Sequence, residues 1–136
     1  MRVYVDSSAL VKRVIQEGES DSLTDTLDEH YQRGDLLASS SLAWVEVSRV
    51  LLARAKSVET AGDLIEAAMS GIDERSMSAD VISVARRIEP LVLRSLDAIH
   101  LATAVLIDAD LVMTYDARLA DACRRNALAV AAPGRE

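Results

Sequence analysis

The sequence predicts an α/β domain in which a mostly parallel sheet is covered by helices on both faces. Short runs of β-branched and apolar residues alternate along the 136 residues with segments whose apolar residues recur at helical spacing. Strands separated by helices imply right-handed crossovers, and therefore parallel neighbours. No repeat, low-complexity segment or linker interrupts the alternation, so residues 1–136 are predicted to form a single domain.

In the first half of the chain, turn and cap residues mark the ends of the predicted elements. Leu23, Leu27 and Tyr31 form one helical stripe, and Gly34 is the stop signal after it. Three successive serines, 39–41, are N-cap candidates for the next helix. Strands are expected over 2–5, 36–39 and 72–77, and helices over 8–16, 20–33, 42–56 and 58–69.

The second half of the chain continues the same alternation. Ser78 and Ser95 are N-cap candidates, and Pro90 ends the helix that Ser78 begins. Helices are expected over 79–88, 95–109 and 117–126, and strands over 111–115 and 128–131. The order of elements therefore supplies a helix between nearly every pair of strands.

The net charge of −7, from 22 acidic and 15 basic residues, is unevenly distributed. Residues 17–35 hold seven of the acids and one of the bases, which leaves 15 acids and 14 bases elsewhere. If a metal neutralised four of those 15 acids, the remainder of the chain would be mildly basic, so a phosphate substrate is permitted. Because the chain has three Tyr, one Trp and no Phe, a base-stacking platform for single strands is disfavoured.

The cysteine content and the hydropathy pattern bear on the compartment. Cys123 is the only cysteine, which excludes an internal disulfide and favours a reducing compartment, the cytoplasm. Uncharged runs are far shorter than the roughly 20 apolar residues that span a bilayer, so no membrane protein is expected. Asp6 also precedes any apolar stretch of the kind found in signal peptides.

Four acidic residues occupy positions where sites form in parallel α/β folds. Asp6 and Asp116 each follow a predicted strand, and sites collect beyond the carboxyl ends of such strands. Glu46 lies one or two turns into a helix that begins at the same edge, and Asp97 lies in the first turn of another. All four carboxylates are therefore expected to converge.

A cluster of carboxylates needs a compensating charge. Two unit charges about 4 Å apart repel by roughly 4 kcal/mol at an effective dielectric constant near 20. A site built only from carboxylate oxygens suits Mg²⁺ or Mn²⁺. The alternative is that Asp6 and Asp97 are helix caps and that Asp116 begins a turn. An exposed helix position is the alternative for Glu46, although its neighbours are mainly apolar and a charge among them needs a partner or a metal.

Four segments of the chain resemble the acidic motifs of PIN-domain nucleases, especially the VapC-type toxins of bacterial toxin–antitoxin pairs. The segments span residues 5–12, 41–47, 96–104 and 114–119. Their order, their spacing and the total length all match, so the resemblance covers essentially the whole chain.

The resemblance implies a fold, an activity and partners. The fold is a three-layer α/β/α sandwich, and the activity is hydrolysis of RNA phosphodiester bonds by an endoribonuclease that needs Mg²⁺ or Mn²⁺. The implied protein partners are a cognate antitoxin and a second copy in a homodimer. By the same resemblance, the expected catalytic and metal-binding residues are Asp6, Glu46, Asp97 and Asp116.

Three further residues are candidates for supporting roles. Ser7 is expected either to hydrogen-bond a water or the scissile phosphate, or to be a turn hydroxyl. Thr114 precedes Asp116 by two residues and points to the same sheet face, where it can support the metal-binding acids. Arg118 is a candidate phosphate contact.

Other polar residues are expected to have structural or solvated positions. His100 shares a helix face with Asp97 but is interpreted as a core histidine with satisfied hydrogen bonds. Lys12 and His30 are expected on solvated helix faces, and Asp121 on the surface.

Two alternative functions come from different classes. A phosphoryl-transfer or receiver domain would use Asp6 or another strand-end acid as nucleophile, but Ser8 stands where a phosphatase has its second acid, and no lysine follows Lys56. A non-enzymatic interaction module would use the apolar helices and the acidic helix near residues 20–33 to recruit partners, but it leaves the four acids unexplained.

Overall fold

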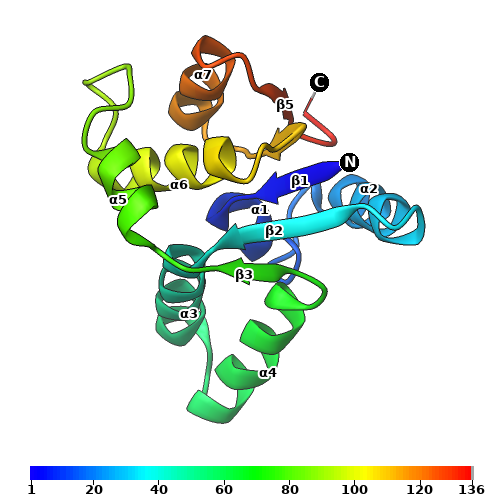
Figure 1. Ribbon diagram of the computed structural model, residues 1–136. Coiled ribbons are helices and arrows are strands. Elements are labelled where there is room, and N and C mark those ends of the chain that lie inside the picture. The colour runs from blue at the N-terminus through cyan, green and yellow to red at the C-terminus, as the bar shows by residue number, and fades with distance from the viewer. Residues whose placement is uncertain (136) are drawn as a thin grey trace.

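The computed structural model describes residues 1–135 and contains one parallel sheet of five strands (Figure 1). β1 is central and pairs with β2 on one side and with β4 on the other. The predicted parallel sheet is confirmed, and every strand pairing is parallel. In the sheet order, the strands are β3 (Asp73–Arg75), β2 (Leu36–Ser40), β1 (Arg2–Val5), β4 (Leu111–Met113) and β5 (Ala129–Ala131).

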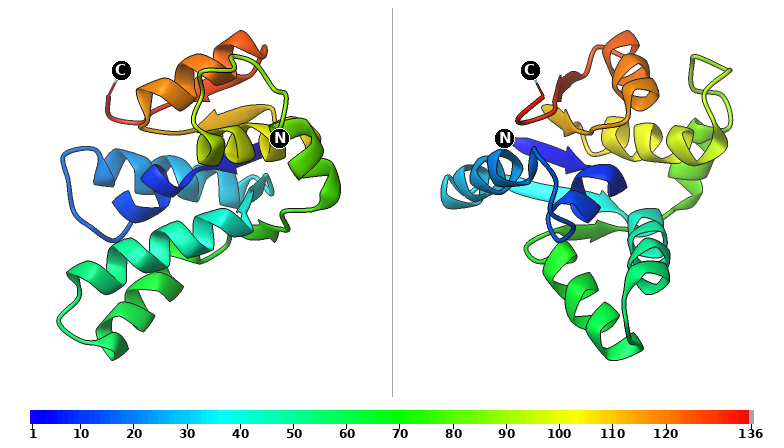
Figure 2. Two further views of the ribbon diagram at one scale, coloured as in Figure 1. Left: turned by 90° about the vertical axis from the view of Figure 1, so that its left-hand side faces the viewer. Right: turned by 180° about the vertical axis from the view of Figure 1, so that it is seen from behind.

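Seven helices in residues 1–135 enclose the sheet. Figure 2 shows α6 and α7 side by side, with α7 against β5 and α6 against β2, whereas α3 and α4 form a hairpin that projects beyond β3. The helices are α1 (Ser7–Lys12), α2 (Ser20–Gln32), α3 (Ser41–Arg54), α4 (Val58–Met69), α5 (Ala79–Ala85), α6 (Ser95–Leu106) and α7 (Ala117–Arg125).

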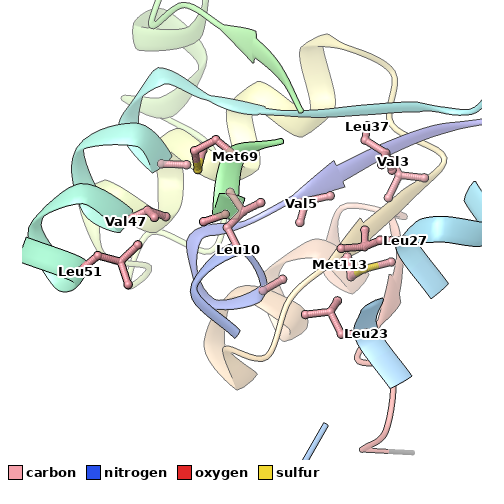
Figure 3. Close-up of a cluster of buried hydrophobic side chains, with 13 residues drawn as sticks. Val3, Val5, Leu10, Leu23, Leu27, Leu37, Val47, Leu51, Met69 and Met113 are labelled. Atoms are coloured by element: carbon pink, nitrogen blue, oxygen red, sulfur yellow. The ribbon is translucent and has the colours of Figure 1, made fainter. Parts of the chain in front are cut away.

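The side chains of β1 alternate between two apolar cores. Val3 and Val5 pack with residues of α1, α2, α3 and α4, such as Leu10 (Figure 3). Tyr4 faces the other way and packs with residues of α6 and α7, such as Leu101. Because successive side chains of a strand point to opposite faces, each face of the sheet has its own helical layer. The predicted three-layer α/β/α fold is therefore confirmed.

Several helices are shorter than the sequence predicts. α1 ends at Lys12 rather than at residue 16, and Arg13 then donates hydrogen bonds to the carbonyls of Ala68 and Ser70. α5 ends at Ala85, three residues before its predicted end. Ser95 is the first residue of α6 and not its cap, because Arg94 holds the N-cap position and makes no capping hydrogen bond with its side chain. At the end of α1, the direction of the chain is thus set by contacts with residues far away in the sequence, which the spacing of apolar residues does not reveal.

Two residues expected on solvated faces are buried. Lys12 is covered by Tyr115, and its ammonium group binds Glu17 at 2.7 Å and Glu19 at 3.3 Å. His30 is buried against Asp35, with 2.9 Å between Nδ1 and the carboxylate. The acidic segment therefore uses part of its charge internally. None of the helices in residues 1–135 is long and apolar enough to cross a membrane.

The strand order creates a switch point between β1 and β4. The chain runs from β1 outward through β2 to β3, and then returns to the other side of β1 for β4 and β5. Crevices at such switch points, beyond the carboxyl ends of the strands, are the usual ligand sites of open α/β sheets. The residues that follow β1 and β4 therefore define the candidate site.

Candidate active site

All four predicted acids lie at the carboxyl edge of the sheet, around the switch point. Asp6 follows β1 as the N-cap residue of α1, and Asp116 follows β4 as the N-cap residue of α7. Glu46 lies in the second turn of α3, and Asp97 lies in the first turn of α6. The negative charges of the other three acids all act on Asp97, so the structure brings the four together.

Asp6 is fixed by hydrogen bonds to both of its carboxylate oxygens. Oδ1 accepts from Ser8 Oγ at 2.7 Å and from the backbone N–H of Ala9 at 3.0 Å, while Oδ2 accepts from Thr114 Oγ at 2.5 Å. Burial raises the pKa of Asp6, and the hydrogen bonds from Thr114, Ser8 and Ala9 oppose that rise. Asp6 therefore caps a helix, as the alternative interpretation held, and also presents a rigid carboxylate at the sheet edge.

Thr114 connects the acids that follow β1 and β4. Its hydroxyl donates to Asp6 and accepts from the backbone N–H of Asp116 at 3.0 Å. Oδ1 of Asp116 in turn caps α7 by accepting from the N–H groups of Arg118 and Leu119. No hydrogen bond from the part of the chain that the structure describes reaches Oδ2 of Asp116, so this oxygen is available to a ligand.

Glu46 receives two hydrogen bonds on the same oxygen. Ser7 Oγ and His100 Nε2 each lie 2.6 Å from Oε1. Burial alone raises the pKa of Glu46, but the hydrogen bonds from His100 and Ser7 outweigh it and lower the pKa below its usual range. Glu46 is therefore ionised and oriented, and no hydrogen bond within residues 1–135 reaches its Oε2.

Asp97 differs from the other three acids because no side chain or backbone group of residues 1–135 donates a hydrogen bond to it. Its side chain is half-buried. Burial raises the pKa of Asp97, and repulsion from Asp116, Glu46 and Asp6 raises it further, against an opposing contribution from His100. Asp97 is therefore the acid of the cluster whose ionised form is destabilised by the other three.

The donor set fits a hard divalent cation. Within residues 1–135, no three or more His, Cys, Asp or Glu side chains form a group that could hold a metal ion by themselves. Mg²⁺ does not need such a group, because it keeps several waters and binds through one or two carboxylates. Glu46 and Asp116 each have one oxygen without a hydrogen bond from the described chain, and Asp97 has two, so carboxylate oxygens are the atoms that this edge offers.

Comparison with known proteins identifies the family of this chain. The family model for the PIN domain matches residues 3–125. The chain belongs to the PIN-domain family. Among its PIN-domain relatives, Ribonuclease VapC46 of Mycobacterium tuberculosis is 41% identical over 133 residues, which cover 96% of this chain and 97% of the relative. Ribonuclease VapC47 of the same species is 37% identical over 134 residues and 97% of each chain.

Solved structures share the PIN-domain fold at much lower sequence identity. VapBC2 from Rickettsia felis, crystallised with a DNA fragment from its promoter, contains a chain that matches with a TM-score of 0.77 at 15% identity, over 96% of this chain and 98% of that one. The FitAcB structure from Neisseria gonorrhoeae matches with a TM-score of 0.74 at 15% identity, over 98% and 99% of the two chains. These likenesses support the fold described above.

The three supporting candidates of this PIN domain have different positions. Ser7 binds Glu46 and Thr114 binds Asp6, so both contact a predicted site acid directly. Arg118 is exposed in the first turn of α7 and makes no ion pair within the described chain. Its side chain lines a cavity of about 320 Å³. Asp121 lines the same cavity but is paired with Arg125 at 2.9 Å, which agrees with its predicted place on the surface.

One hydrogen bond of this PIN-domain site was not predicted from the sequence. His100, interpreted as a core histidine, is buried as expected, but it also binds Glu46. Its spacing of three residues from Asp97 was the one signal that it faces the acids. Arg94 lines the cavity beside Arg118, and nothing in the local sequence distinguished it from other exposed arginines.

Proposed function

We propose that this PIN-domain protein is a metal-dependent endoribonuclease and the toxin of a toxin–antitoxin pair. The observation that carries the proposal is the convergence of Asp6, Glu46, Asp97 and Asp116 at the switch point, with carboxylate oxygens available to a cation. The names of the relatives, ribonucleases of the VapC type, supply the substrate class. The whole chain, residues 1–136, acts in this proposal as one nuclease domain.

The four carboxylates would hold Mg²⁺ or Mn²⁺. When bound, such an ion polarises a phosphoryl oxygen and stabilises negative charge on the leaving oxygen. Asp6, with both oxygens fixed by hydrogen bonds, gives the site a rigid negative charge. Glu46 and Asp116 each use one oxygen for protein hydrogen bonds and keep the other for the ion.

Asp97 is the acid best suited to take up the proton of the attacking water. It is half-buried and receives no hydrogen bond within the described chain, and its pKa is raised by burial and by its acidic neighbours. Burial and the lack of a hydrogen bond donor make a carboxylate a better base, and both persist when a cation offsets the repulsion among the acids. In the reaction, the water oxygen bonds to phosphorus as the bond from phosphorus to the 3′-oxygen breaks, and the water proton passes to the Asp97 carboxylate. The leaving 3′-oxygen keeps the electron pair of the broken bond and takes up a proton from solvent water.

Cation removal tests the proposed reaction. We expect the purified protein to cleave RNA with millimolar Mg²⁺ or Mn²⁺ and to lose cleavage completely in excess EDTA, with recovery when the metal is restored. Cleavage is measured on a labelled RNA pool, with products separated by electrophoresis. Undiminished cleavage in excess EDTA would exclude the metal-dependent mechanism.

The cavity lined by Arg94 and Arg118 is suited to an RNA phosphate next to the scissile one. Arg94 and Arg118 both line it, and neither makes an ion pair within residues 1–135. Each flanks a site acid in sequence, since Arg94 precedes Asp97 by three residues and Arg118 follows Asp116 by two. An arginine without a carboxylate partner can bind phosphate through two hydrogen bonds.

We expect the double replacement Arg94→Gln and Arg118→Gln to weaken RNA binding and its salt dependence. Removing two cations that each neutralise a phosphate of a single strand reduces the slope of log K against log salt by about 1.4. Binding is measured by fluorescence anisotropy in an Asp97→Asn background, which prevents turnover. The double replacement Arg49→Gln and Arg54→Gln, at two exposed positions of α3, is the matched control, and an equal change in the control would remove this cavity from the RNA path.

Protein partners complete the proposal. Exposed apolar side chains on the α3–α4 hairpin offer a surface for a protein partner, and we propose that the cognate antitoxin covers it: Val45, Val50, Leu52 and Val58. VapBC2 from R. felis is one of the solved complexes that support an antitoxin partner. We further propose that the protein forms a homodimer and that it is cytoplasmic. Cys123 is a buried free cysteine, and burial raises the pKa of its thiol to about 12. In the reducing cytoplasm such a thiol stays reduced and unreactive.

A further inference from the structure

We propose that His100 is a positioning residue that holds the Glu46 carboxylate in the site, and that Tyr4 fixes the tautomer in which His100 does so. The importance of Glu46 rests on the proposed nuclease function, whereas the hydrogen bonds can be tested without it. The three residues come from three elements, since Tyr4 lies in β1, His100 in α6 and Glu46 in α3. They form one continuous chain of hydrogen bonds across the edge of the sheet.

The protein environment determines which ring nitrogen of His100 carries the proton. Tyr4 Oη lies 2.5 Å from Nδ1 of His100 and accepts a hydrogen bond from the backbone N–H of Ser40 at 3.2 Å. Because the backbone of Ser40 donates to Oη, the tyrosine proton is free to be donated to Nδ1 of His100. Burial raises the pKa of Tyr4, so the hydroxyl keeps that proton and remains a donor.

The proton on His100 must then lie on Nε2. A neutral imidazole has one donor and one acceptor nitrogen, so a ring whose Nδ1 accepts from Tyr4 presents an N–H at Nε2. That nitrogen lies 2.6 Å from Oε1 of Glu46. His100 is 3% exposed and packs edge-on against the Tyr4 ring, with 5.8 Å between ring centroids, so it cannot turn freely.

The direction of these hydrogen bonds decides how Glu46 meets a ligand. Both Ser7 and His100 donate to Oε1, which turns Oε2 away from the protein donors. The Glu46 side chain is 29% exposed, so without these two donors it has room to swing into solvent. His100 also lies one turn from Asp97 on α6, so the same side chain ties the position of Glu46 to that of Asp97.

Two replacements of His100 separate positioning from packing. The amide of glutamine reaches about as far as Nε2 and can still donate to Glu46, whereas the amide of asparagine reaches only as far as Nδ1. We expect His100→Asn to weaken Mn²⁺ binding about 10- to 100-fold, which is typical when a partner of a metal ligand is lost. His100→Gln should remain within a few-fold of the wild-type affinity. Thr103→Val removes a buried hydroxyl from the same helix, one that bonds the carbonyl of Ile99 and does not contact Glu46. This variant should bind Mn²⁺ with unchanged affinity.

The measurements are isothermal titration calorimetry with Mn²⁺ and long-range proton–nitrogen NMR of the metal-free protein. In the NMR spectra, Nδ1 of His100 should have the shift of an unprotonated ring nitrogen and Nε2 that of a protonated one. Glu46→Gln should move the Nε2–H proton upfield, because a neutral amide accepts more weakly than a carboxylate. Tyr4→Phe should shift the Nδ1 resonance, because Nδ1 loses its donor, while Nε2 stays protonated against the Glu46 carboxylate.

The outcomes distinguish this proposal from the proposed function. A proton on Nδ1, or on both nitrogens, would overturn the tautomer, and equal Mn²⁺ affinities for His100→Asn and wild type would overturn the positioning role. If the wild type binds no Mn²⁺ or cleaves no RNA, the nuclease proposal fails, and the response of the Nε2–H proton to Glu46→Gln still decides whether His100 holds Glu46. Circular dichroism and thermal melting confirm that each variant is folded.

Discussion

Replacement of Asp97 by asparagine is expected to lower kcat for RNA cleavage by about 10²- to 10⁴-fold, the usual contribution of a positioned general base. Asp97 is the site acid without a protein hydrogen bond in the described chain, and the other three acids raise its pKa after burial has done so. Asparagine keeps the shape of the side chain but can neither take up a proton nor supply negative charge. Single-turnover cleavage of a defined RNA at saturating Mg²⁺ measures the effect on the chemical step.

The matched control for this loss is Asp63→Asn. Asp63 is an exposed acid on α4 that makes no ion pair within residues 1–135, so its replacement also removes one negative charge. We expect the control to cleave RNA within a few-fold of wild type. An Asp97→Asn protein with nearly wild-type kcat would mean that Asp97 has no part in the chemistry.

The sequence predicts site residues best where an acidic residue directly follows a predicted strand. Its pattern alone places Asp6 and Asp116 at strand ends, and the sheet order puts those ends on either side of the switch point. The predicted bounds of α4 are also correct, because Ser57 caps its first turn and Gly71 follows its end with φ of 76°. Local signals suffice where the hydrogen bonds that end an element come from its own flanking residues.

Contacts between distant segments are beyond the reach of sequence patterns. His100 lies 96 residues from Tyr4 and 54 from Glu46, so no spacing could show that it joins them. Lys12 is expected in solvent because it lies on a short amphipathic helix, yet Tyr115 covers it from the other half of the chain. A histidine or lysine is polar in any sequence window, and only tertiary structure decides whether its charge and hydrogen bonds are used inside the protein.

The helix-cap interpretation of the acids and the metal-site interpretation are compatible in this structure. Asp6 and Asp116 cap α1 and α7 with Oδ1, and the capping bonds hold their carboxylates at the sheet edge. Asp97, which the cap interpretation also included, makes no capping bond within the described chain. The two interpretations therefore differ only at Asp97, where repulsion is not offset by a hydrogen bond from residues 1–135.

Without metal, Asp97→Asn is expected to melt a few degrees higher than wild type at neutral pH. The pKa of Asp97 is raised in the folded protein, first by burial and then by Asp116, so the folded state binds this proton more readily than the unfolded state. Its contribution to stability is therefore fully present below the unfolded pKa and is lost as the pH rises through the folded pKa. At neutral pH the ionised Asp97 carboxylate therefore destabilises the folded state. Asparagine removes this cost and loses no hydrogen bond seen in residues 1–135. The advantage of the variant over wild type should shrink as the pH falls through the folded pKa of Asp97.

Mg²⁺ should reverse the order of the two proteins. A ligand at 100 times its Kd stabilises the folded state by about 2.7 kcal/mol, and Asp97→Asn should lose most of this gain because it lacks one carboxylate of the site. Melting curves of both proteins, with and without millimolar Mg²⁺ at fixed ionic strength, test both parts. Asp63→Asn should follow wild type in both conditions, since its charge lies on α4. If metal does not stabilise wild type and Asp97→Asn melts lower without it, then the four acids are not coupled, and the metal-dependent nuclease proposal loses its physical basis.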